Sequence, residues 1–187
     1  MNNTIGISGS PKINRGAAYF YLKKIDINNI ISSYVYSLND TEKIMSAHTI
    51  VFTFPLYVDS LPSHFVKFLN LLENSKIENK NIYAICNLGF HEGVQGDIAL
   101  DIIRNFCLRT NNNYMGGISI GTGPIGFMKY PLINIGIKRE LKRLKKCINN
   151  NTSYQNTFIQ SKLPRFIYRK CANIAFNHEI KKNLTRK

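Results

Sequence analysis

Short apolar runs alternate with segments of helical periodicity along most of this chain, and this alternation restricts its fold more than any other feature. Five runs predict strands: 5–7, 32–40, 48–57, 81–90 and 114–123. A segment of helical spacing follows each of them: 16–25, 41–47, 61–73, 94–110 and 137–148. Near-continuous apolar strands separated by helices are typical of a parallel sheet that is covered on both faces.

Five strand–helix units in about 150 residues favour a flavodoxin-like, doubly wound α/β sheet over a six-stranded dinucleotide-binding fold. We therefore predict a five-stranded parallel sheet with strand order 2-1-3-4-5. A chain of 187 residues with 44% hydrophobic residues suits one domain, 1–187, with a core over about 1–149. A basic helical C-terminal extension is expected over about 150–187. It comprises a loop over 149–160 and a last helix over 163–180, which packs through Phe166, Ile167, Ala172 and Ile174.

Several classes of protein are disfavoured by what the sequence lacks. It has no apolar run of about 18 residues and no basic segment ahead of a long apolar stretch near Met1, which argues against a membrane span or a secretory signal. We expect a cytoplasmic protein. The four cysteines, at 86, 107, 147 and 171, lie far apart and include no C-x-x-C pair. We expect buried free thiols and no metal site.

The loop after the first predicted strand has the composition of an anion-binding turn. The backbone amides near Gly9 and at the start of the next helix, the hydroxyls of Ser8 and Ser10, and the charge of Lys12 or Arg15 all favour a phosphate. Neither G-x-x-x-x-G-K-[ST] nor G-x-G-x-x-G is present, which argues against a nucleoside triphosphatase and a Rossmann dinucleotide site. A monophosphate remains, and the alternative is a tight strand-to-helix turn without a ligand.

Three further loops are expected at the same edge of the sheet. After the third strand, Pro55 fixes the backbone and leaves the amides of Leu56 and Tyr57 free to meet a planar ring, on which Tyr57 can stack. After the fourth strand, Asn87 and the following amides can bond ring carbonyls, and Glu92 is either a polar ligand contact or a solvated side chain. After the fifth, the segment 121–126, which includes Gly121 and Thr122, is a candidate wall or lid of the site.

In combination, four segments resemble the NAD(P)H-dependent FMN reductase family of flavodoxin-like proteins. They are GSPK at 9–12, FPLYVDSLPSHFVKFL at 54–69, NLGFHEGVQGDIALDIIRNFC at 87–107 and GGISIGTG at 116–123. The resemblance spans about residues 4–126. Two departures stand out, at Gly16-Ala17-Ala18, where relatives carry hydroxyl side chains, and at Pro124-Ile125, where relatives often carry glycines.

The resemblance implies a cofactor site in three parts and a homodimer with its sites near the interface. The FMN phosphate is placed on the 10–18 loop, with the residues Ser10, Lys12, Asn14, Arg15, Gly16, Ala17 and Ala18. The flavin ring is placed against Pro55, Leu56, Tyr57 and Val58, and its other edge near Asn87, Leu88, Gly89 and Phe90. The implied reaction transfers hydride from NAD(P)H to FMN and then reduces a quinone, flavin, nitro or azo compound or a metal ion. No side chain needs to act as a catalytic acid or base.

The positive charge of the chain is concentrated in its C-terminal third. Residues 1–128 contain 10 Lys and Arg against 9 Asp and Glu, whereas residues 129–187 contain 15 against 2. The predicted helix 137–148 places its basic residues outside an apolar stripe, and this face is either simply solvated or docks to an anionic membrane or an acidic partner. Nucleic acid is disfavoured because no recognised motif accompanies the charge. Besides the reductase, a one-electron carrier and a non-catalytic binding module stay open.

Overall fold

The computed structural model describes residues 3–122, 135–160, 162 and 164–184. The residues Gly123, Pro124, Ile125 and Gly126, predicted as part of a wall or lid, lie outside this described part. Within it, no helix combines the length and apolar character needed to cross a membrane.

The structure is built on a single parallel sheet with strand order β2-β1-β3-β4-β5-β6. The strands are β1 (Thr4–Ser8), β2 (Ile30–Ser32), β3 (Thr49–Pro55), β4 (Asn81–Asn87), β5 (Asn113–Ile120) and β6 (Thr157–Ile159). The five predicted strands occur in the predicted order, which confirms the doubly wound α/β fold.

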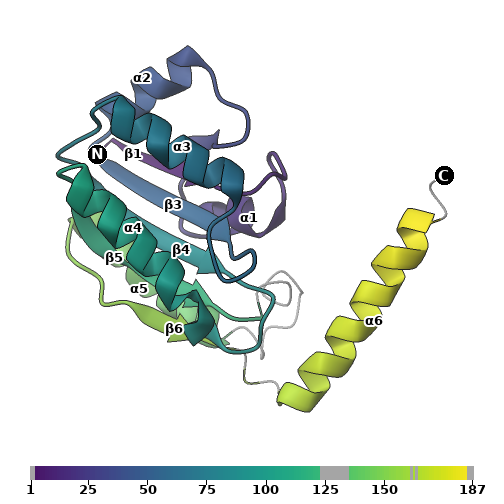
Figure 1. Ribbon diagram of the computed structural model, residues 1–187. Helices are drawn as coiled ribbons and strands as arrows, with labels where there is room; N and C mark the ends of the chain where they lie inside the picture. Colours follow the sequence, from purple (N-terminus) through teal and green to yellow (C-terminus); the bar gives the residue numbers. More distant parts are fainter. Residues whose placement is uncertain (1–2, 123–134, 161, 163, 185–187) are drawn as a thin grey trace.

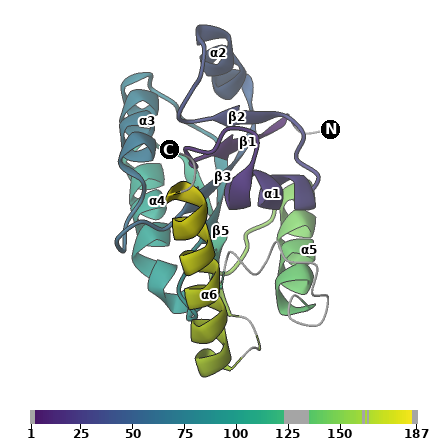
Figure 2. The same ribbon diagram turned by 90° about the vertical axis from the view of Figure 1, so that its right-hand side faces the viewer.

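Helices cover both faces of this sheet (Figures 1 and 2). They are α1 (Gly16–Lys24), α2 (Leu38–Ser46), α3 (Ser63–Asn74), the 3-10 turn η1 (Gly93–Gly96), α4 (Asp97–Arg109), α5 (Ile135–Asn150) and α6 (Arg165–Leu184). In Figure 2, α3 and α4 lie on one side of the sheet and α1 and α5 on the other, because each helix presents one apolar stripe to it.

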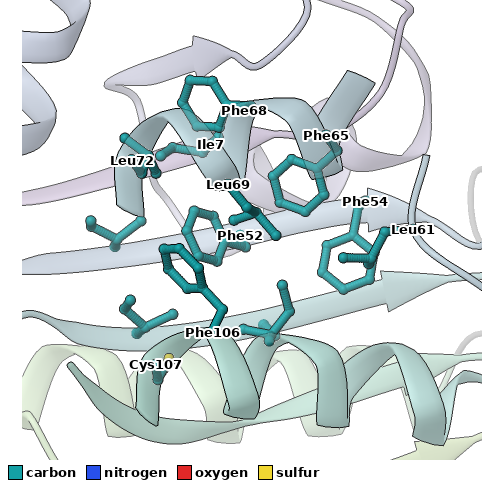
Figure 3. Close-up of a cluster of buried hydrophobic side chains, with 14 of the residues drawn as sticks. Ile7, Phe52, Phe54, Leu61, Phe65, Phe68, Leu69, Leu72, Phe106 and Cys107 are labelled. Atoms are coloured by element: carbon teal, nitrogen blue, oxygen red, sulfur yellow. The ribbon is translucent and has the colours of Figure 1, made fainter. Parts of the chain in front are cut away.

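The two faces of the sheet carry separate hydrophobic clusters. The cluster beneath α3 and α4 contains Phe52, Phe65 and Phe106, which pack edge to face with ring centroids 5.5 Å (Phe52–Phe65) and 6.1 Å (Phe52–Phe106) apart (Figure 3). The cluster beneath α1 and α5 is mainly aliphatic and includes Val51 and Ile118. Because these residues alternate along each strand, a single strand contributes to both cores.

The second strand and the helix after it differ from the sequence prediction. A strand over 32–40 was expected, but β2 ends at Ser32 and α2 already begins at Leu38. Ser37 caps this helix reciprocally with Asp40: the Asp40 amide donates to Ser37 Oγ at 3.2 Å, and the Ser37 amide donates to Asp40 Oδ2 at 2.9 Å. This capping box starts the helix three residues earlier than predicted.

A sixth strand lies where a loop was predicted over 149–160. Residues 157–159 pair in parallel with Ile118–Ile120 of β5, so α5 is the crossover between two neighbouring strands. Three residues carry too little periodicity to mark a strand in the sequence, and the exposed edge of β5 supplies the hydrogen-bond partners that define it.

The last helix does not pack as predicted. Phe166 is 66% exposed and Ile174 is 70% exposed, Ile167 is also exposed, and Ala172 is only half-buried. Figures 1 and 2 show α6 standing apart from the sheet, in front of the edge at which the strands end. The expectation that these four side chains anchor α6 to the core is therefore wrong, since its apolar residues do not form one stripe.

Candidate functional site

A cavity of about 300 Å³ opens at the carboxyl ends of β1, β3 and β4. All of its lining residues belong to the set predicted from the sequence: Ser10, Lys12, Gly16, Ala17, Ala18, Pro55, Leu56, Tyr57, Asn87, Leu88 and Gly89. Three segments that are far apart in the chain thus meet at one place. This edge is where open parallel sheets bind ligands.

The first wall of the cavity is the turn between β1 and α1, which is held close to the neighbouring strand. The Gly9 amide donates to the carbonyl of Thr53 at 2.7 Å. A Cβ at Gly9 would lie 2.8 Å from Phe54 Cβ, so only glycine allows this approach. On the other side, His64 Nε2 lies 3.1 Å from the Gly9 carbonyl oxygen, and Nε2–H is the donor. The turn is therefore fixed from both β3 and α3.

The start of α1 leaves its backbone donors available at the cavity. Arg15, in extended conformation, precedes the helix, and no side chain caps the first turn. Gly16 has φ +85°, a left-handed conformation that suits glycine, and it lines the cavity together with Ala17 and Ala18. Uncapped amides at a helix start bind anions, and Lys12 adds a positive charge. Phosphate binding here stays a prediction, for which backbone amides and Lys12 are available although the first turn of α1 has no hydroxyl side chain.

The second wall of the cavity is the segment after β3, in which two backbone amides are already hydrogen-bonded. The Leu56 amide donates to the Asn87 carbonyl at 2.9 Å, and the Tyr57 amide donates to the Ser60 carbonyl at 2.9 Å. The expectation that both amides are free to meet a ring is therefore wrong. Pro55, Leu56 and Tyr57 line the cavity, and Tyr57 is 47% exposed whereas Leu56 belongs to the buried cluster beneath α3 and α4.

The third wall carries a polar atom without a partner in the described part of the protein. Asn87 is buried, and its side-chain oxygen Oδ1 accepts no hydrogen bond there. A buried acceptor without a hydrogen-bond partner lowers the stability of the folded protein by about 1–3 kcal/mol. Because Asn87 lines the cavity, a ligand that brings an N–H or O–H group can satisfy it.

Eight predicted residues are not among those that line the cavity. They are Ser8, Asn14, Arg15, Val58, Phe90, Glu92, Gly121 and Thr122. Of these, Arg15 lines an adjoining surface hollow with Gly16 and Tyr19. Thr122 is fully buried and its amide donates to the Phe90 carbonyl at 2.6 Å, so it braces the loop after β4.

The same loop is tied to the first turn of α6. The Tyr168 hydroxyl donates to the Gly89 carbonyl, its ring lies 5.6 Å from that of His91, and Arg165 Nε lies 3.3 Å from Glu92 Oε1. Glu92 is therefore an ion-pair partner of α6. No local sequence signal links Tyr168 to Gly89, because the two residues are 79 positions apart.

His64 is a further residue that the sequence prediction did not include. It lies in the first turn of α3, its Nε2 bonds the Gly9 carbonyl, and its ring meets Tyr34 edge to face at 5.3 Å. Partial burial lowers the pKa of His64, and the bond to Gly9 opposes this shift. A neutral imidazole with its proton on Nε2 is the form that fits the bond to Gly9.

A larger cavity lies at the opposite end of the sheet. It measures about 510 Å³ and is lined by residues that include Thr4, Ile27 and Lys145. It opens near the amino ends of the strands, where the side chains of Lys145 and Asp26 form an ion pair. Parallel sheets do not place ligands at that end, and no buried acceptor without a partner lines it. The smaller cavity is the better candidate site.

Neither a family model nor a curated protein sequence matches this chain. Solved structures do match. A WrbA-like flavodoxin from Agrobacterium tumefaciens has a TM-score of 0.60 at 13% identity, with 81% of this chain and 97% of that one covered. An NADPH-quinone reductase from P. pentosaceus has a TM-score of 0.58 at 14% identity, with 79% and 96% covered.

A flavodoxin from Fusobacterium nucleatum, solved with bound flavin mononucleotide, has a TM-score of 0.52 at 16% identity, with 78% of this chain and 98% of that one covered. The chain has a flavodoxin-like fold. At these sequence identities the similarity shows a shared fold only. Function has to be inferred from the residues of the cavity.

Proposed function

We propose that this protein binds FMN in the cavity at the carboxyl ends of β1, β3 and β4 and acts as an NAD(P)H-dependent flavin oxidoreductase. The observation that carries the proposal is the pairing of two unlike ends in one cavity of about 300 Å³. One end offers uncapped amides and Lys12 to an anion, and the other offers the unpartnered Oδ1 of Asn87. FMN has a phosphate at one end and ring N–H and carbonyl groups at the other.

Each wall of the cavity has a separate role in holding this cofactor. The amides of Gly16, Ala17 and Ala18 and the Lys12 ammonium bind the phosphate, and the side chains of Pro55, Leu56 and Tyr57 pack on the ring. Asn87 Oδ1 accepts a hydrogen bond from a ring N–H. Bound FMN would supply the two-electron chemistry between a nicotinamide and an acceptor.

The protein itself contributes position and exclusion of water rather than acid–base chemistry. Tyr57 is the one side chain lining the cavity, besides that of Lys12, that carries an ionisable group. Hydride transfer needs no proton donor on the protein, so a rigid cavity with fixed donors is sufficient. We further propose a homodimer in the cytoplasm, with a small molecule as electron acceptor.

The first test distinguishes protein contacts to the phosphate of FMN from contacts to its flavin ring. FMN and riboflavin are titrated into the protein, with flavin fluorescence as the readout, for wild type, Lys12→Ala and the control Lys67→Ala, an exposed lysine on α3. The Lys12→Ala substitution weakens FMN binding by roughly 10- to 150-fold and leaves riboflavin binding unchanged, because a charge-assisted bond contributes about 1.5–3 kcal/mol. Lys67→Ala changes neither affinity.

Absorbance completes the test. The FMN-loaded protein is mixed with NADPH or NADH without oxygen, and loss of the oxidised-flavin bands supports the reductase. A protein that binds no FMN even with the cofactor in excess contradicts the whole proposal. A protein that binds FMN and is not reduced by either nucleotide is an electron carrier instead.

The electron carrier is the second candidate because of the basic outer face of α5. Arg139 and Arg143 are both bonded to Glu140, at 3.2 and 2.6 Å, and Lys145 pairs with Asp26. In the described residues, Lys138, Lys142 and Lys146 have no such acidic partner. This face suits an acidic protein or an anionic membrane surface, and reduction of an acidic partner that slows steeply with added salt would support it.

A further inference from the structure

The outer surface of α5 carries a continuous row of positive charge. Lys138, Lys142 and Lys146 are all exposed and recur every four residues, so they lie one above the other along the helix. In the part of the chain that the structure describes, none of the three forms an ion pair. Their charge is therefore available to a partner outside the chain.

Two arginines beside this row add to the charge. Arg139 Nε lies 3.2 Å from Glu140 Oε1, and Arg143 Nη1 lies 2.6 Å from Glu140 Oε2. The Glu140 side chain is only 6% exposed, whereas the two arginine side chains are 75% and 64% exposed. One buried carboxylate thus faces two exposed guanidinium groups, and the group of three stays positive toward solvent.

Helix α1 extends the basic surface. It lies on the same face of the sheet as α5 (Figure 2), and Asp26, just after α1, pairs with Lys145 of α5. Lys23 and Lys24 of α1 are exposed and have no acidic partner among the described residues. We call the exposed cations of the two helices the α1/α5 surface: Lys23, Lys24, Lys138, Arg139, Lys142, Arg143 and Lys146.

The opposite face of the protein has no such excess of charge. Helices α3 and α4 together contain three basic and three acidic residues, whereas α1 and α5 contain eight basic residues and one acidic residue. On α3 and α4, Arg104 pairs with Asp101 at 2.6 Å and Arg109 pairs with Glu73 at 3.1 Å. The protein is therefore electrically polarised, and an anionic surface would attract it with the α1/α5 surface in front.

The composition of the α1/α5 surface favours a lipid bilayer over an acidic protein. Interfaces between proteins have an apolar core, and lysine is depleted in them. Here five of the seven defining residues are lysines, and the aliphatic residues of α5 are buried against the sheet: Ile137, Leu141, Leu144 and Ile148. Exposed lysines need no partner of complementary shape, and this suits a plane of anionic lipid headgroups.

Aromatic side chains on α1 support the same partner. The ammonium of Lys23 lies 5.7 Å from the ring centre of Tyr19, and that of Lys24 lies 5.3 Å from the ring centre of Phe20. Tyr19 and Phe20 also line a surface hollow together with Arg15 and Lys23. Tyrosine is enriched at membrane–water interfaces, because its ring contacts apolar groups and its hydroxyl contacts water. A hollow with both cations and rings suits the boundary between headgroups and acyl chains.

We propose that the α1/α5 surface docks this protein on an anionic lipid bilayer. None of its seven defining residues lines the candidate cofactor cavity, so docking does not depend on FMN and leaves the cavity open. Gly16 lines both the cavity and the hollow on α1, so the mouth of the cavity borders the docked surface. The attraction is between exposed charges, and it therefore weakens as the salt concentration rises.

The experiment measures sedimentation of the full chain with lipid vesicles. Wild type binds vesicles of equal parts phosphatidylglycerol and phosphatidylcholine, and it does not bind vesicles of phosphatidylcholine alone. The double variant Lys142→Gln/Lys146→Gln binds the anionic vesicles roughly 30-fold more weakly, the loss expected of two lysines near such a surface. Glutamine is a good helix former, so the thermal unfolding midpoint does not change.

The matched control removes two charges from the other side of the sheet. Lys67 and Lys76, on α3 and just after it, are exposed and have no acidic partner in the described residues. The variant Lys67→Gln/Lys76→Gln therefore has the same net charge as the α5 variant. At about 0.1 M salt, where screening acts over about 10 Å, its binding to anionic vesicles equals that of wild type.

Several results would overturn the inference. One is a wild type that does not bind anionic vesicles, and another is an equal loss in both double variants, which would indicate net charge without a docking surface. Duplex DNA and polyglutamate are tested at the same salt concentration. Tighter binding to either than to vesicles would assign the surface to nucleic acid or to an acidic protein. None of these results bears on the proposed function, which the flavin titration tests separately.

Discussion

The two C-terminal helices, α5 and α6, are both long and basic, yet they relate to the protein in opposite ways. In α5, Ile137, Leu141, Leu144 and Ile148 are all buried against the sheet. In α6, only Tyr168 is buried among the side chains that the structure describes, and Phe166 and Ile174 are largely exposed. The total apolar content of a helix therefore does not decide whether it docks.

The spacing of the apolar residues accounts for the difference. The four buried residues of α5 are separated by four, three and four positions, so they form one stripe along the helix. In α6 the apolar residues are spread around the helix: Ile167 and Ile174, seven positions apart, lie on one side, whereas Ala172 lies on the opposite side. As a result, α6 is held through its first turn, where it meets the loop after β4.

The largest expected effect compares one truncation in each helix. Leu144→Ala, in α5, lowers the free energy of unfolding by about 2–5 kcal/mol, because it leaves a cavity at a fully buried position. Ile174→Ala, in α6, changes it by less than about 0.5 kcal/mol. Urea denaturation of the two variants measures both values. Equal losses would mean that α6 is packed in solution and would remove the contrast.

A smaller effect is expected where α6 is attached. Tyr168→Phe removes the hydroxyl that donates to the Gly89 carbonyl and costs about 1 kcal/mol. Amide hydrogen exchange over residues 165–184 becomes faster, whereas exchange in α5 does not change. Tyr34→Phe, at an exposed tyrosine, serves as the control. If α6 exchanges equally in wild type and Tyr168→Phe, another contact holds the helix.

The last effect is absent at neutral pH, appears only at alkaline pH, and concerns the tyrosine that packs beneath α5. Burial raises the pKa of Tyr154 to about 12, compared with an unfolded value of about 10. Because the folded pKa is the higher one, this stabilising contribution is complete below pH 10 and is lost as the pH rises toward 12. Tyr154→Phe therefore loses less stability than wild type between pH 10 and 12, as measured by urea unfolding. Identical slopes for the two proteins would contradict the raised pKa.

Sequence periodicity was a reliable guide where an element buries one continuous stripe. The apolar run 48–57 and the helical spacing of Phe65, Phe68 and Leu72 predicted β3 and α3 to within two residues at each end. The prediction failed for β2, where the capping box of Ser37 and Asp40 ended the extended region early. It also failed for β6, whose three residues are defined by pairing with β5.

The candidate site shows the same division. The segments that line the cavity could be predicted because strand ends, glycines and a proline mark them in the sequence. The hydrogen bonds of the Leu56 and Tyr57 amides could not, because their acceptors depend on strand register and on the turn to Ser60. The links from His64 to Gly9 and from Tyr168 to Gly89 join residues 55 and 79 positions apart.

The sequence by itself determined the alternation of strands and helices, their order in the sheet, and the three segments that meet at the site. These follow from local periodicity and from the connection rules of parallel sheets. Only the tertiary structure decided that Asn87 keeps an unpartnered oxygen, that Val58 is held left-handed and exposed, and that α6 stands apart from the core. Partners, strain and exposure depend on groups that are distant in the chain, and local sequence patterns do not record those distances.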